Sequence, residues 1–151
     1  GLMGTRAYVG PNDRQYVTIS DKTVGAALLP CTFVTEAATA FSAATAFGPN
    51  VRLLLNRDFY DTDYFDTSDP LLTAYASGDT GVALVIEPGQ HVMCAMAAAT
   101  YTWGQELVIA AAGRAAGAAS SGVVIGFTRF AGAKSAGDLG EIEFCMPYVK
   151  A

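Results

Sequence analysis

Charge is scarce in this sequence, and positive charge above all. Charged residues make up 15% of the 151 residues, whereas an ordinary soluble domain carries about a quarter. The nine Lys and Arg are outnumbered by fourteen Asp and Glu, which gives a net charge of -5. A protein that binds a nucleic-acid backbone needs clustered Lys and Arg, so the composition argues against a nucleic-acid partner. A surface poor in charge instead favours apolar contact with another protein.

Cysteine and histidine are also few. The three cysteines, Cys31, Cys94 and Cys145, stand far apart and form no CxxC motif. This pattern argues against a disulfide framework or a zinc site, and it suits a protein made in a reducing cytosol. His91 is the single histidine, and no GxSxG motif supplies a nucleophile for it. We therefore expect no catalytic residues and no enzymatic activity.

Long apolar runs are missing as well. Val92–Ala99 is far shorter than the ~20 residues that a membrane-spanning helix needs. Leu107–Ala119 is interrupted by Gly113, Arg114 and Gly117. Gly1–Gly10 lacks the basic start and apolar core of a secretory signal. We expect no membrane partner, and the failed GxxxxGK[ST] spacing near Lys134 gives no reason to expect a cofactor.

What the chain does contain is a series of short β-prone runs separated by Gly, Pro and Asn turns. The expected strands are Tyr16–Ile19, Leu28–Val34, Val51–Asn56, Gly81–Ile86, His91–Met96, Glu106–Ala110, Val123–Phe130 and Glu141–Met146. Pro30 predicts an edge strand, and Gly126 predicts a bulge or barrel corner. In Glu141–Met146 the apolar residues alternate with Glu and Cys, which predicts one buried face.

The remaining segments complete the predicted domain. Glu36–Phe47 fits helix by its Ala content and strand by its Thr content, and we favour strand. We expect a helical turn in Leu71–Ser77 and loops in Ala97–Gly104 and Ala131–Gly140. This spacing predicts an all-β fold, a small antiparallel β-barrel or sandwich with long loops. Residues 1–22 are expected to form an extended N-terminal arm, and residues 23–151 a single domain.

Acidic charge gathers in one inserted loop, residues 57–70, which holds five Asp and one Arg. The spacing of these Asp residues does not match an EF-hand loop, so we expect no metal site. Four aromatic residues lie among them, and aromatic residues are enriched at protein interfaces. The candidate interface residues are Phe59, Tyr60, Tyr64 and Phe65 of this loop, together with Trp103.

An ordered series of motifs resembles the head decoration proteins of phages. An AYAxGD segment stands at residues 74–79 and a PGQ turn at 88–90. A YTxGxxLxxAxxGR run at 101–114 and a GxVVGFxRF strand at 122–130 follow. The stretch VRLLLNR at 51–57, followed by the acidic loop, also fits. The match covers about half of the chain well, and the acidic and aromatic character of the loop departs from the family pattern.

The resemblance implies a virion structural protein with a β-barrel core. Such proteins bind the outer face of the major capsid protein, usually as a homotrimer, and stabilise the expanded head. It therefore implies assembly in the host cytoplasm and a final location on the outer capsid surface. Two alternatives stay open: another virion β-domain from a tail or baseplate, and a carbohydrate-binding β-domain that uses Trp103, Tyr101 and the acidic loop.

Overall fold

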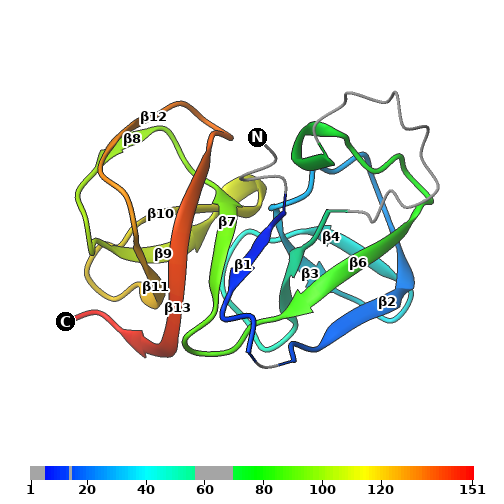
Figure 1. Ribbon diagram of the computed structural model, residues 1–151, viewed down its shortest axis with the longest axis horizontal. Coiled ribbons are helices and arrows are strands. Elements are labelled where there is room, and N and C mark those ends of the chain that lie inside the picture. Colours follow the sequence, from blue (N-terminus) through cyan, green and yellow to red (C-terminus); the bar gives the residue numbers. More distant parts are fainter. Residues whose placement is uncertain (1–5, 14, 57–69) are drawn as a thin grey trace.

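The computed structural model describes residues 6–13, 15–56 and 70–151. These residues form a closed β-barrel and a larger β-sheet that lie side by side (Figure 1). Among them, helical structure is limited to two short 3-10 turns, η1 (Pro70–Leu72) and η2 (Ala111–Gly113). The prediction of an all-β fold with a small barrel is confirmed.

The barrel is built from the first half of the chain. Its strands are β2 (Thr18–Val24), β3 (Phe33–Glu36), β4 (Ala40–Ala43), β5 (Val51–Leu54) and β6 (Thr80–Val85). They close in the order β2-β4-β3-β5-β6, with β6 returning to β2. All pairs are antiparallel except β2 and β4, which run parallel where Thr23 meets Ala40. Closure removes the free strand edges that an open sheet would expose.

Buried side chains pack inside the barrel. Phe41, Leu54 and Tyr75 are fully buried there, and the Tyr75 hydroxyl donates a hydrogen bond to the carbonyl of Leu55 at 2.8 Å. Gly81 faces them: a Cβ at this position would lie 3.1 Å from the Phe41 ring. The inside of the barrel is therefore a packed core.

The second unit is a six-stranded antiparallel sheet. Its strands are β1 (Tyr8–Gly10), β7 (His91–Ala95), β13 (Leu139–Val149), β11 (Val123–Thr128), β9 (Glu106–Ala110) and β10 (Arg114–Gly117), in that spatial order. A two-stranded ribbon, β8 (Ala99–Tyr101) with β12 (Gly132–Lys134), joins it. The segment expected as an N-terminal arm supplies β1, which pairs with β7, and most of β2.

The long central strand β13 shows the alternation that its sequence predicts. Ile142 and Phe144 are buried, while Glu141 and Glu143 are partly exposed. Met146 differs from the prediction, since it is 72% exposed. The pairing of β13 with β7 has ended by then, the last register pair being Glu143 with His91. The Gly126 bulge is confirmed by a register shift between Val124 and Gly126 on β11.

Other sequence expectations were wrong at particular backbone positions. The strand expected at Leu28–Val34 begins only at Phe33, because Pro30 has no N–H and Cys31 adopts a φ of 71°. It is also not an edge strand, since β3 pairs on both sides within the closed barrel. The two expected loops contain β8 and β12, each of which is only three residues long and too short for an alternating pattern to show in the sequence.

The barrel and the sheet share one core. The rings of Phe33 on β3 and Phe144 on β13 meet edge to face, with centroids 6.1 Å apart. Cys31 ties the two units through its backbone, donating to Leu54 at 2.7 Å and accepting from the Ala95 N–H at 2.9 Å. Gly113 N–H adds a third link to the carbonyl of Ala44 at 2.8 Å. The junction is therefore rigid, and surfaces that span it can be preorganised.

Candidate interaction surfaces

Trp103 is held out on a tight turn between β8 and β9. Gly104 supplies the positive φ, 75°, that the third position of a type II turn needs. The buried hydroxyl of Thr128 clamps the turn from below, donating to the Thr102 carbonyl at 2.5 Å and accepting from the Gln105 N–H at 2.9 Å. The Trp103 ring is 63% exposed. The indole is therefore accessible on a clamped turn, and its contact role stays a prediction.

A charged network lies beside Trp103 on the outer face of the sheet. The Arg129 guanidinium sits 5.3 Å from the centre of the Trp103 ring and pairs with Glu141 at 3.2 Å and Glu143 at 3.1 Å. His91 faces the same carboxylates, at 3.8 Å from Glu141 and 3.2 Å from Glu143. Both imidazole nitrogens are thus directed at carboxylates. Arg129 also covers one face of the indole on which a sugar would otherwise stack.

The described ranges contain neither a metal-ligand cluster nor a candidate membrane-spanning helix. Within residues 6–13, 15–56 and 70–151, no group of three or more His, Cys, Asp or Glu side chains is arranged to hold a metal ion. No helix in the same ranges is long and apolar enough to cross a membrane. The three cysteines, all of which are described, form no disulfide. Cys94 is buried at the core, where burial raises the pKa of its thiol well above the ordinary value.

The end of β13 carries a second exposed apolar group. Met146 and Val149 are 72% and 66% exposed. Tyr148 lies between them and donates a short hydrogen bond to the Glu106 carboxylate. The Lys150 ammonium lies 3.3 Å from the same carboxylate. Apolar side chains and a small charged cluster therefore meet at this end of the sheet.

We expect Glu106 to titrate below its ordinary pKa. The Tyr148 hydrogen bond is the main cause, and Lys150 lowers the pKa of this carboxyl further against the opposing effect of desolvation. A carboxyl with a lowered folded pKa adds stability above its unfolded pKa, and this contribution is lost as the pH falls through the folded value. The change Tyr148→Phe should raise the pKa of Glu106 and shift this loss to higher pH. Carboxyl carbon shifts followed by NMR from pH 7 to pH 2 measure this.

The Lys150→Gln variant is the matched comparison for this titration. It should also raise the Glu106 pKa, because it removes an ammonium group whose hydrogen bond and charge both lower that pKa. An unchanged Glu106 titration in Tyr148→Phe would show that the hydroxyl does not bond the carboxylate in solution.

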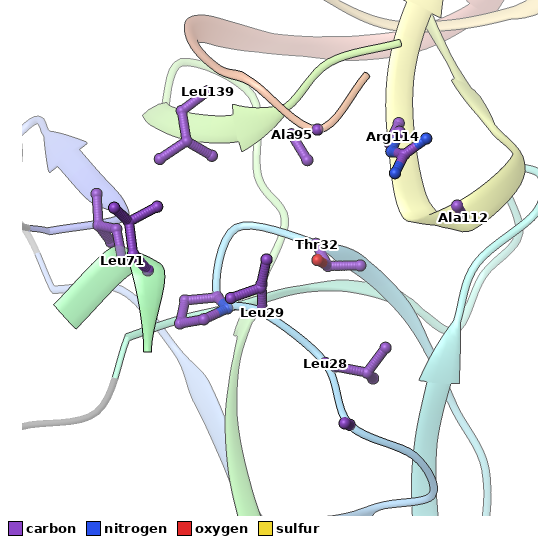
Figure 2. Close-up of a pocket in the computed structure, with 12 residues that line it drawn as sticks. Leu28, Leu29, Thr32, Leu71, Ala95, Ala112, Arg114 and Leu139 are labelled. Carbon is purple, nitrogen blue, oxygen red and sulfur yellow. The ribbon is translucent and has the colours of Figure 1, made fainter. Parts of the chain in front are cut away.

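A groove of about 200 Å³ crosses the junction between barrel and sheet (Figure 2). Its walls come from the segment before β3, from η1, from the end of β7, from η2 with the start of β10, and from the start of β13. The residues that line it are Ala27, Leu28, Leu29, Pro30, Thr32, Leu71, Leu72, Ala95, Ala112, Arg114, Gly137 and Leu139. The groove was not predicted from the sequence.

Of the five candidate interface residues, the structure describes Trp103. Phe59, Tyr60, Tyr64 and Phe65 lie outside the described residues, so their contact role stays a prediction. Trp103 lies on the sheet side of the molecule, in the β8–β9 turn (Figure 1). The described surface therefore offers three separate features: the Trp103 face, the end of β13 and the junction groove.

Comparison with known proteins identifies a similar fold but no matching family. No protein-family model matches the chain, and no curated protein matches it. A solved structure does: the N base of the head fiber protein gp8.5 of bacteriophage phi29. The alignment covers 86% of this chain and 94% of that chain, with a TM-score of 0.57 and 12% sequence identity. The architecture described here is thus similar to that of a phage head fiber base.

Proposed function

We propose that this chain is a phage virion structural protein that binds the outer surface of the major capsid protein shell and stabilises the expanded head. One observation carries the proposal: nearly the whole chain shares its fold with the base of a phage head fiber. Such a base is the part of a fiber at which attachment to a head is expected. The order of decoration-like motifs in residues 71–130 points in the same direction.

The physical character of the surface supports a binding role in place of a catalytic one. The chain has few charges, and several large apolar side chains are more than half exposed, namely Val17, Leu72, Trp103, Met146 and Val149. Exposed apolar side chains on a rigid frame are typical of surfaces that dock on other proteins. A protein that binds the assembled shell and not its dissociated subunits stabilises the shell by its binding free energy. Many copies on one particle strengthen the effect by avidity.

The test is reconstitution on particles. Undecorated shells of the phage that encodes the chain are incubated with the purified protein, pelleted and imaged by cryo-electron microscopy. We expect bound protein as protruding density on the head, arranged around local three-fold axes if it binds as a homotrimer. Density on the tail or baseplate would instead support the other virion assignment. Absence of the protein from every part of the particle would refute the proposal.

Within this experiment, we expect Trp103→Ala to weaken binding. An aromatic anchor at the centre of an interface commonly contributes about 2 kcal/mol or more, which is roughly 30-fold in affinity. The matched control is Val17→Ala, which shortens another exposed apolar side chain, 55% exposed, on the barrel side. The double variant Tyr64→Ala with Phe65→Ala tests the loop aromatic residues in the same way. Full occupancy by Trp103→Ala would exclude the Trp103 face from the contact surface.

Self-association is the remaining part of the proposal. We expect a trimer without metal or disulfide, since oligomers of one chain close by symmetry and the charge-poor surface favours burial between copies. Sedimentation in reductant and chelator, with and without shells, measures this against the 15.7 kDa monomer.

A further inference from the structure

The junction groove contains two polar groups in otherwise apolar walls. Its lining is made of Ala, Leu, Pro and Gly residues except for Thr32 and Arg114. Arg114 is the one charged residue in that lining. Figure 2 shows Thr32 below the groove and the Arg114 guanidinium above it, between Ala95 and Ala112. The chemistry of the groove is therefore decided by what these two side chains can bind.

Thr32 offers an unused hydroxyl. Its side chain is only 7% exposed, and its hydroxyl makes no hydrogen bond with any residue that the structure describes. The methyl group is turned to Gly113, since a Cβ on that glycine would lie 2.5 Å from Thr32 Cγ2. The oxygen lies on the other side, toward Leu29 (Figure 2). A buried hydroxyl without a partner is costly and rare, so a ligand group that accepts its hydrogen bond would be stabilised.

Arg114 offers an unused positive charge. The other arginines placed near this side of the sheet and in the barrel are paired, Arg129 with Glu141 and Glu143, and Arg52 with Glu36 at 3.2 Å. Arg114 is partly buried at the start of β10, and its guanidinium forms no ion pair or hydrogen bond within the described part of the chain. A guanidinium and a hydroxyl that face one groove are both donors. Together they select an anionic acceptor, and a carboxylate matches the planar guanidinium best.

The rim of the groove indicates the size and nature of the ligand. A cavity of about 150 Å³ holds a benzene-sized group, so this volume of about 200 Å³ accepts one large apolar side chain. Leu29 and Leu72 stand at the rim with 46% and 67% of their surface exposed. A small molecule inside the groove would leave these leucines in water. An extended polypeptide lying across the rim would cover them.

We propose that this groove is a peptide-binding site for a partner segment in which a large apolar residue stands next to a carboxylate. The apolar side chain enters the groove between Leu71 and Leu139. The carboxylate pairs with the Arg114 guanidinium and accepts a hydrogen bond from the Thr32 hydroxyl. This inference is independent of attachment to a capsid shell, and its test uses no shells.

The probes are blocked hexapeptides that contain one leucine and one aspartate, in either order and either adjacent or separated by one residue. The control peptides have asparagine in place of aspartate. Binding is followed by amide chemical shifts of the ¹⁵N-labelled protein. We expect shifts at Thr32, Ala95 and Arg114 with the best aspartate peptide. Loss of the charge should weaken binding about tenfold, since hydrogen bonds to charged groups are the stronger ones.

Variants separate the two donors. Arg114→Gln should weaken the aspartate peptide about tenfold and leave the asparagine peptide nearly unchanged. Thr32→Val, which keeps the shape, should weaken it about threefold. Lys150→Gln is the control: it removes one positive charge beyond the far end of β13, roughly 30 Å from Leu139, and should change nothing. Thermal unfolding of each variant checks the fold.

Three results would overturn the proposal. The first is that no peptide of the set binds. The second is equal affinity for aspartate and asparagine peptides, or unchanged affinity in Arg114→Gln. The third is that 4-methylpentanoate, which is leucine without its amino group, binds as tightly as the best peptide, which would make the groove a site for small apolar acids.

Discussion

Replacing Gly113 by alanine should remove about 3 to 5 kcal/mol from the free energy of unfolding. Gly113 has a φ of 67°, where a Cβ costs about 1 kcal/mol or more. An added Cβ would also overlap the backbone oxygen of Phe33, which already accepts the Ala44 N–H at 2.9 Å, and would lie 2.5 Å from Thr32 Cγ2. Because both neighbours belong to the barrel–sheet junction, the overlap forces the two units apart. Urea unfolding measures the change, provided that the slope m stays constant.

Gly104→Ala is the matched control for this experiment. Gly104 has a similar φ of 75°, but no atom lies within 4 Å of the position that its Cβ would occupy. The Gly104→Ala variant should therefore lose only about 1 kcal/mol of its free energy of unfolding, which is the cost of the strained backbone. Equal losses in the two variants would mean that the junction relaxes freely around Gly113, and that the close packing described there does not limit stability.

Phe144→Ala should lower the free energy of unfolding by a similar amount, about 3 to 5 kcal/mol. Phe144 is 1% exposed and meets Phe33 edge to face across the junction. Its removal leaves a cavity that both the barrel and the sheet would have to fill. Strand pairing holds its backbone from two sides, since Gly126 opposes it on β11 and Gln90 accepts its N–H at 2.9 Å. The surrounding structure can therefore collapse little, and most of the cavity cost should remain.

Met146→Ala, two residues along the same strand, is the control. Met146 is 72% exposed, so its truncation should change the free energy of unfolding by less than about 0.5 kcal/mol. A large loss at Met146 would indicate that it is buried between copies of the chain in solution. A small loss at Phe144 would contradict the single shared core.

The strands that could be predicted from sequence are those whose side chains alternate. β13 and β7 contain Ile142, Phe144, Val92 and Cys94 on one face, and a period of two identifies such strands directly. β8 and β12 have three residues each, which is too short for a period of two to show, and it is their pairing with each other that identifies them as strands. The break at Pro30 and Cys31 was also hidden. A cysteine with a positive φ is set by its two long-range backbone hydrogen bonds, to Leu54 and from Ala95, and by no local pattern.

The candidate interaction surfaces could likewise be predicted only in part from the sequence. Trp103 could be selected by residue type alone, and its exposure agrees with that selection. The groove could not be predicted from the sequence, because its two polar residues are far apart in the chain. Thr32 lies just before β3 of the barrel, and Arg114 lies at the start of β10 of the sheet. Threonine and arginine are ordinary surface residues until the fold places one in a buried wall and leaves the other without a carboxylate. Only the tertiary arrangement makes them a pair.

The end of β13 bears on how the protein behaves in a crowded solution. From Cys145 to Val149 this strand pairs with β11 on one side, while its pairing with β7 stops at Glu143. Its other edge is thus open among the described residues, beside exposed Met146 and Val149. Such an edge can template the stacking of further strands into fibres. Pro147 stands within it and has no N–H to offer, so a second copy cannot form a continuous hydrogen-bonded ladder along this edge. A proline at this position lets the protein keep an apolar contact surface in solution without polymerising through it.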